Sequence, residues 1–278
     1  MRQAFQRYAA LLGHVPGTPK HESLRRLVYA HVVRVPFENV SKLLLYGREK
    51  AGRLTTIDEF LNGIEHHDLG GTCYSSNPFF AELLRELGYD AELLGADMNN
   101  PNVHTSVRVR LDGYEYHVDV GNASPFLEPI RLDQLPQCVS RGNMRWVFDR
   151  ATDGRLEVKV YSGEQHVHGY KVNEKPHELE FFRSIVCDSF ERGRTFMSLL
   201  RLVRIFPEHT VELKDRTLRV HRGTETVERR LESQAEVREA VNTQFLMPRC
   251  PVEKAVEILE SINGISFFSE ASEASLYA

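Results

Sequence analysis

The sequence predicts a multi-domain α+β fold: an N-terminal helical region, a central β-barrel or curled sheet and a C-terminal α/β segment. Two observations predict it. Apolar residues recur at helical spacing through residues 1–90, and from Ala91 onward the period changes to the alternation typical of strands. The 278 residues, 41% of them hydrophobic, are enough for one large domain or two to three small ones.

Composition excludes several classes of function. A net charge of −4 gives no general attraction to nucleic acid or to anionic membranes. No apolar run has membrane-spanning length, and Arg2, Gln3, Gln6 and Arg7 interrupt any signal-peptide core. We therefore expect a cytoplasmic protein.

The four cysteines are Cys73, Cys138, Cys187 and Cys250, at irregular spacing and without a CxxC pair. In a reducing compartment this pattern argues against a disulfide framework and against a structural zinc site.

Residues 1–90 form the first predicted domain, the helical bundle. Helices are expected over residues 4–12 and 22–33, and a third helix is capped by Thr55 or Thr56. The packing of these helices indicates fold rather than function.

The fourth helix of this bundle follows Gly70 and Gly71, which allow a tight turn and a close backbone approach. Cys73 comes next, followed by Pro78, which is tolerated in a first helical turn, and by apolar residues at helical spacing. Cys73 is therefore expected at the positive end of a core-packed helix, where a thiolate is favoured. The alternative, that Cys73 is a small buried hydrophobic residue, stays open at this point because a nucleophile also needs a base.

The second predicted domain, residues 91–177, is a β-barrel or curled sheet. Its strongest signal is a hairpin with Asp112-Gly113 as its two-residue turn. The expected strands are 91–95, 104–111, 114–120, 146–149 and 156–161.

The hairpin turn fixes a register in which Leu111 pairs with Tyr114 and Val107 with Val118. One face is then wholly apolar and must lie on the core. The other face is polar, and it places His104 diagonal to Asp119, close enough for a carboxylate to reach an imidazole. A slip of one residue would expose the valines, so the register is strongly specified.

Cys73, His104 and Asp119 are the residue types of a nucleophile, a base and a residue that orients the base, a cysteine-protease-like core. Taken singly, His104 and Asp119 are more often ordinary strand residues. The catalytic interpretation requires the helix start to meet the end of the hairpin.

Interdomain helices are expected over residues 178–207 and an α/β segment over 208–278. In this segment we expect strands at 211–213, 218–221 and 225–230, and helices at 235–245 and 252–261.

Two histidine groups are weaker candidates, for metal binding. His66-His67-Asp68 places adjacent residues on a helix, where they do not converge on one ion. His166 and His168 could share a strand face, but no third ligand accompanies them at a sensible spacing. No metal is predicted.

Together these residues resemble the arylamine N-acetyltransferase family, and the resemblance implies that family's architecture: a helical bundle, a β-barrel and an α/β lid, the lid over residues 208–278. The resemblance rests on Val35-Pro36-Phe37-Glu38-Asn39, Gly70-Gly71-Thr72-Cys73 with Asn77 four further on, His104, and Val118-Asp119-Val120-Gly121. It implies that Cys73 accepts an acyl group, normally acetyl, from coenzyme A, with His104 as its base and Asp119 as the orienter. The acyl group would then pass to an arylamine, hydrazine or N-hydroxyarylamine in a ping-pong reaction.

The resemblance also marks Phe37, Thr72 and Asn122 as candidate substrate contacts. A neutral aromatic amine requires an apolar pocket, and Phe37 is a candidate wall, although plain core packing would also explain it. The expected partners are an acyl-CoA and a small-molecule amine, with the protein a monomer or homodimer.

The chain departs from the family pattern at three places. Leu69 replaces an arginine before the glycines, Ser75 replaces a glutamate, and Asn122-Ala123-Ser124-Pro125 replaces a Phe-Gly sequence. Three alternatives are therefore kept: an amide synthase that takes its acyl group from a carrier or from within one substrate, a transglutaminase- or protease-like hydrolase, and a non-catalytic small-molecule binding protein.

Overall fold

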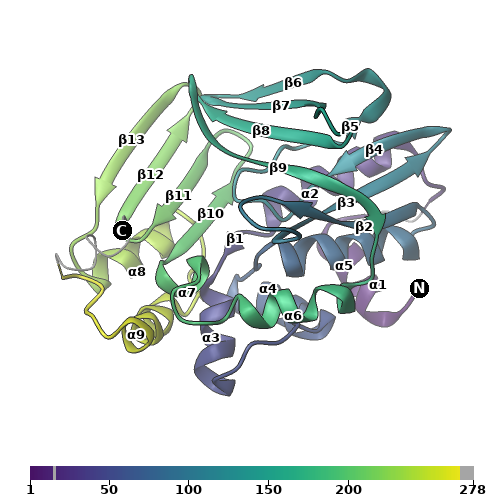
Figure 1. Ribbon diagram of the computed structural model, residues 1–278. Coiled ribbons are helices and arrows are strands. Elements are labelled where there is room, and N and C mark those ends of the chain that lie inside the picture. Colours follow the sequence, from purple (N-terminus) through teal and green to yellow (C-terminus); the bar gives the residue numbers. More distant parts are fainter. Residues whose placement is uncertain (15–16, 270–278) are drawn as a thin grey trace. The chain divides into compact units, whose positions relative to one another are not determined.

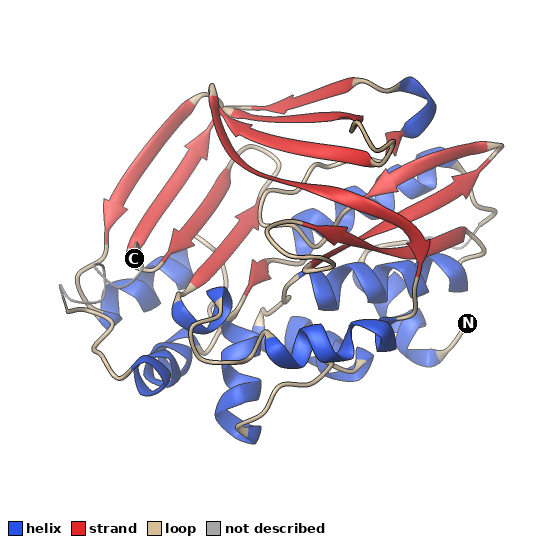
Figure 2. Ribbon diagram, viewed as in Figure 1, coloured by secondary structure: helices blue, strands red, loops and turns tan. Residues whose placement is uncertain are grey.

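The computed structural model describes residues 1–14 and 17–269, and its contacts divide the chain into two compact units. Unit 1 comprises Met1–Arg34 and Thr72–Phe182, and unit 2 comprises Val35–Gly71 and Arg183–Ala278. Helices and curled sheets confirm the predicted α+β class (Figure 2). The division into four consecutive domains stays a prediction, and each unit is built from two separate stretches of chain.

Unit 1 contains one large antiparallel sheet that curls into a half-barrel, with the strand order β5-β4-β3-β2-β9-β8-β7-β6 (Figure 1). The strands are β2 (Asp90–Asp97), β3 (His104–Leu111), β4 (Tyr114–Val118), β5 (Ile130–Arg131), β6 (Gln137–Arg141), β7 (Met144–Arg150), β8 (Leu156–Ser162) and β9 (Gln165–Pro176). The helices are α1 (Gln3–Leu11), α2 (His21–Arg34) and α5 (Cys73–Glu86), with short 3₁₀ helices at Leu132–Gln134 and Leu179–Phe182.

Helix α5 packs against β2 and β3. Its side chains Phe80, Leu83 and Leu84 are fully buried, as their helical spacing predicts. The helix begins at Cys73, so the predicted position of the cysteine at a helix start is confirmed. Pro78 differs from expectation, because it lies inside the helix beyond its first turn.

The hairpin of β3 and β4 has the predicted register: Leu111 pairs with Tyr114, and Val107 with Val118. Both valines are fully buried. The other face differs from expectation, since His104 and His117 are also buried. The reason is that the curled sheet encloses this end of the hairpin within a second core, made of Leu94, Ala96, Phe126, Ile130, Trp146, Phe148, Leu156, Val158, Val160, Tyr170 and Val172.

Unit 2 is built on a five-stranded antiparallel sheet with the strand order β1-β10-β11-β12-β13 (Figure 1). The strands are β1 (Phe37–Glu38), β10 (Arg201–Ile205), β11 (Thr210–Lys214), β12 (Thr217–Arg222) and β13 (Glu225–Arg230). The helices are α3 (Val40–Glu49), α4 (Ile57–His67), α6 (Arg183–Asp188), α7 (Thr195–Ser198), α8 (Gln234–Thr243) and α9 (Val252–Asn263).

The segment predicted as interdomain helices, residues 178–207, is only partly helical. It holds the short helices α6 and α7, but Arg201–Ile205 forms strand β10. The prediction is wrong there because β10 pairs with β1 on one side and with β11 on the other. Such long-range pairing overrides local propensity.

Glu38 organises the start of unit 2. Its buried carboxylate accepts hydrogen bonds from the backbone N–H of Ser41 at 2.8 Å and of Gly70 at 3.0 Å. Its own N–H donates to the carbonyl of Gly71 at 3.1 Å. Glu38 thus binds a backbone N–H in the first turn of helix α3 and holds the glycine pair that leads to Cys73 in sequence.

Gly70 is required for this close approach. A Cβ atom there would lie 1.9 Å from the carbonyl oxygen of Pro36, which is backbone and cannot swing aside.

We predict that Gly70→Ala destabilises the protein, because the added methyl group forces the backbones of Pro36 and Gly70 apart. The expected loss is about 1–3 kcal/mol, visible as a lower thermal midpoint in circular dichroism. The control is Gly17→Ala, since nothing lies within 4 Å of a Cβ at Gly17. Equal midpoints for the two variants would contradict the prediction.

Candidate active site

Cys73 is the first residue of α5 and is buried. Its carbonyl oxygen accepts a hydrogen bond from the Thr105 hydroxyl at 2.9 Å, and this bond connects the start of the helix to β3. The backbone comes close here as well: a Cβ at Gly121 would lie 2.7 Å from the Cα of Cys73. Glycine at 121 therefore lets the segment after β4 pass directly beside the cysteine.

His104 and Asp119 meet as the register predicts. His104 opens β3, Asp119 follows β4, and the His104 Nε2 atom lies 2.7 Å from Asp119 Oδ2. The His104 residue is only 3% exposed and Asp119 is 0% exposed, so water does not screen their interaction.

The Cys73 side chain completes the group, because it lies close enough to the imidazole of His104 to raise the pKa of that ring. Burial alone lowers the pKa of His104, but the charge and hydrogen bond of Asp119, followed by those of Cys73, outweigh it and raise that pKa above its usual value. The protonated imidazole is therefore the favoured form at neutral pH. The structure thus brings the three predicted side chains together.

Asp119 receives an unusual number of donors within the described part of the chain. Burial would raise the pKa of its carboxyl, but the charge and hydrogen bond of His104 and the hydrogen bond of Asn77 hold it below its usual range. The donors are Asn77 Nδ2 at 2.9 Å and the Gly121 N–H at 3.1 Å on Oδ1, and His104 Nε2 at 2.7 Å, the Tyr170 hydroxyl at 2.9 Å and Asn122 Nδ2 at 3.2 Å on Oδ2.

Asn77 joins helix α5 to both strands of the hairpin. Its Nδ2 atom donates to Asp119 and to the Thr105 carbonyl, and its Oδ1 atom accepts from the Val120 N–H at 2.9 Å. From the sequence alone, Asn77 has no predicted role in the site. A signal existed, since Asn77 lies one helical turn after Cys73 and so shares its face of the helix.

Tyr170, on β9, is a second site residue that the sequence analysis missed. Its buried hydroxyl donates to Asp119, and burial followed by the charge of Asp119 raises the pKa of the phenol well above its usual value. Tyr170 is 51 residues from Asp119 in sequence, and only the pairing of distant strands brings the two together.

The three candidate substrate contacts have different surroundings. Thr72 precedes α5, and its carbonyl accepts from the Ser75 and Ser76 N–H groups. Asn122 is buried and directs its amide nitrogen to Asp119. Phe37, in unit 2, lies with its ring 5.7 Å from that of Phe196. Their contact with substrate stays a prediction.

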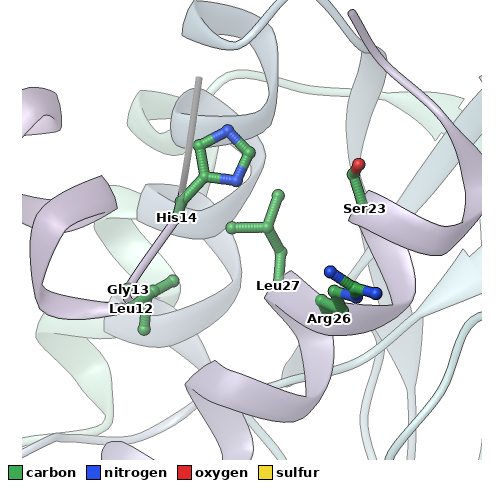
Figure 3. A pocket seen from close by; sticks show the side chains of 6 residues that line it. All are labelled: Leu12, Gly13, His14, Ser23, Arg26 and Leu27. Carbon is green, nitrogen blue, oxygen red and sulfur yellow. The ribbon is translucent and has the colours of Figure 1, made fainter. Parts of the chain in front are cut away.

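Within residues 1–14 and 17–269, no group of three or more His, Cys, Asp or Glu side chains is placed to hold a metal ion. None of the helices in these residues is long and apolar enough to cross a membrane. A cavity of about 120 Å³ lies near the end of α1 (Figure 3). Its lining residues, which are distant from Cys73 in sequence, are Leu12, Gly13, His14, Ser23, Arg26 and Leu27.

A thiol, an imidazole and a carboxylate linked in this order are the arrangement of enzymes that form a covalent acyl intermediate. Comparison with known proteins shows an acyltransferase. The N-acetyltransferase family profile matches residues 21–248, and the chain belongs to the arylamine N-acetyltransferase family.

Curated relatives include the arylamine N-acetyltransferase of Mycolicibacterium smegmatis, 28% identical over 244 residues, which cover 82% of this chain and 86% of the relative. The proansamycin X synthase of Amycolatopsis mediterranei is 31% identical over 131 residues, 42% of this chain and 47% of that protein.

Solved structures share the fold. The arylamine N-acetyltransferase of Mycobacterium abscessus superposes with a TM-score of 0.79 at 22% identity, over 93% of this chain and 94% of that one. That of Mycobacterium marinum, solved in complex with CoA, superposes with a TM-score of 0.76 at 20% identity, over 93% and 99%.

We predict that Asp119→Asn lowers the pKa of His104, because it removes the negative charge that raises this pKa. The fall should be at least about one unit, measured by NMR titration of the His104 imidazole. Asp133→Asn is the control, because Asp133 is exposed and pairs with Arg131. An unchanged His104 titration in Asp119→Asn would contradict the prediction.

Proposed function

We propose that this protein transfers an acetyl or other short acyl group from coenzyme A to an arylamine, hydrazine or N-hydroxyarylamine, by a ping-pong reaction through a thioester on Cys73. The observation that carries this proposal is the buried chain of Cys73, His104 and Asp119 at the start of α5, in a member of the arylamine N-acetyltransferase family.

In the first half-reaction, the Cys73 thiolate attacks the carbonyl carbon of the acyl-CoA thioester. The bond between that carbon and the CoA sulfur breaks, and the departing sulfur takes the proton of the His104 imidazolium. The products are acyl-Cys73 and free CoA. Asp119 keeps the ring oriented and stabilises its charged form.

In the second half-reaction, the amine nitrogen attacks the thioester carbon and the bond to the Cys73 sulfur breaks. His104, now neutral, takes a proton from the amine and returns to the imidazolium form. The amide leaves and the thiolate of Cys73 is restored.

Backbone N–H groups at the start of α5 are suited to stabilise the oxyanion of each tetrahedral intermediate, since the first N–H groups of a helix have no partner within it. A donor of this kind is worth about 3–4 kcal/mol of transition-state stabilisation. Phe37, Thr72 and Asn122 are the proposed substrate contacts. A cytoplasmic location and a monomeric or homodimeric state complete the proposal.

One alternative has an observation of its own. One relative, proansamycin X synthase, is named a synthase and not an acetyltransferase. This is compatible with an amide synthase, in which the acyl group reaches Cys73 from a carrier or from another part of the same substrate. The role of the Cys73 group would be the same, and only the source of the acyl group would differ.

We predict that mixing the protein with acetyl-CoA, without an amine, adds one acetyl group to Cys73. Intact-protein mass spectrometry and peptide mapping would detect it. Cys73→Ala should give no adduct and lose at least about a thousandfold in arylamine turnover, because the nucleophile is absent. The control is Cys138→Ala, which removes an exposed free cysteine and should leave both results unchanged.

Other outcomes would redirect the proposal. An adduct formed from a carrier thioester but not from acetyl-CoA would favour the amide synthase. Cleavage of a peptide or ester without CoA would favour a hydrolase, and CoA binding without any adduct would indicate a binding protein. Substantial turnover by Cys73→Ala would reject Cys73 as the nucleophile.

A further inference from the structure

His117 is a buried histidine in the half-barrel that the proposed reaction does not use. It lies on β4, two residues before Asp119, and is 1% exposed. Its ring is 5.6 Å from that of Phe126 and 6.4 Å from that of Phe148, measured between centroids. Packing among aromatic rings would suit an apolar side chain equally well, so the polar atoms of His117 need an explanation of their own.

The polar atom that matters is Nε2, which lies 3.0 Å from the Tyr170 hydroxyl oxygen. The same hydroxyl donates its proton to Asp119 at 2.9 Å. A hydroxyl group has one proton to donate and two lone pairs to accept with. Since Tyr170 gives its proton to Asp119, His117 must donate to Tyr170, and its own proton must reside on Nε2.

We propose that His117 is a positioning residue: by donating from Nε2 to the Tyr170 hydroxyl, it keeps that hydroxyl pointed at Asp119. Two sets of hydrogen bonds then end on Asp119: one is donated from His117 through Tyr170, and the other is donated by His104, the neighbour of Cys73. The proposal rests on the proposed roles of Cys73, His104 and Asp119.

The surroundings keep His117 in the neutral form that this role uses. Burial lowers the pKa of His117 to about 4, and the charge of His104 acts in the same direction against the opposing charge of Asp119. Across the hairpin, His117 pairs with Arg108, whose guanidinium is bound to Glu92, and on its other side it pairs with Ile130. Tyr170, uncharged because its pKa is raised, faces it from β9.

A fixed hydroxyl matters because Asp119 is ionised and excluded from water. Each hydrogen bond donated to a buried carboxylate stabilises its charged form. If the proton of His117 were on Nδ1, its bare Nε2 atom would accept the proton of the Tyr170 hydroxyl. That hydroxyl would then present a lone pair to the Asp119 carboxylate. Donors in a chain also polarise one another, so the bond from Tyr170 is stronger when Tyr170 itself accepts one.

The tautomer gives a direct test that needs no substrate. In the intact protein with ¹⁵N-labelled histidine, we expect the His117 ring to be neutral near pH 7, with its proton on Nε2. An imidazolium, or a neutral ring protonated on Nδ1, would overturn the proposal. Neither result depends on whether the protein transfers acyl groups, so this test is separate from the test of the proposed function.

A second test uses alkylation of Cys73 by iodoacetamide as a function of pH, without an acyl donor. The side chain of His117→Phe fills the space but cannot donate, so Asp119 is less well stabilised. The acid limb of the rate–pH profile should then move to higher pH by about half to one unit. At a fixed pH below the midpoint of this limb, the rate of Cys73 alkylation should be about three- to tenfold lower than in the native protein. His117→Gln, whose amide can donate from a similar place, should keep the native profile.

Two comparisons separate positioning from packing. In a Tyr170→Phe background, His117→Phe should shift the limb no further, because the chain is already broken. Phe148→Leu alters the packing around His117 without removing a donor, and should lower stability while leaving the limb in place. The proposal fails if Phe148→Leu shifts the limb as much as His117→Phe, if His117→Phe causes no shift, or if the shifts of His117→Phe and Tyr170→Phe simply add.

Discussion

A buried, ionised carboxylate is the feature on which the organisation of unit 1 depends. Removing a carboxylate from water is costly unless other groups replace its hydration. Asp119 meets this requirement with donors from separate parts of the unit: Asn77 from α5, His104 from β3 and Tyr170 from β9. The residues that stabilise the buried charge are therefore also those that connect the helix, the hairpin and strand β9 of the half-barrel.

This requirement explains why the polar end of the hairpin is buried. Val107 and its neighbours pack towards the apolar core, as alternation requires, and the opposite face would ordinarily be in water. The sheet curls instead, so that β9 brings Tyr170 over Asp119 and His117 lies among Phe126 and Phe148. A barrel interior of this kind supplies a low dielectric, in which the charge of Asp119 acts strongly on His104.

Features governed by neighbouring residues could be predicted from the sequence, and those governed by distant contacts could not. The turn at Asp112-Gly113 determines the hairpin register, and the register alone brings His104 to Asp119. The apolar spacing after Cys73 likewise predicts a helix that begins at the cysteine. By contrast, nothing near Tyr170 marks it as a partner of Asp119, because β9 reaches the hairpin only through its pairing with β2. Pairing with distant strands is also the reason why Arg201–Ile205, which was predicted to be helical, forms a strand.

Asn122, where the chain departs from the expected family pattern, also supports the buried carboxylate of Asp119. The resemblance to the family implies an aromatic residue at this position, whereas this chain has a short amide that is turned inward, with Nδ2 donating to Asp119 and Oδ1 accepting from the Ser124 N–H. The following backbone is held as well, since the indole of Trp146 donates to the Ser124 carbonyl at 2.8 Å. An aromatic ring at this position would add apolar surface, whereas Asn122 adds a donor to the carboxylate. Asn122 therefore strengthens the support of the buried carboxylate, and the segment that follows β4 is held by the same group of hydrogen bonds that stabilises the charge of Asp119.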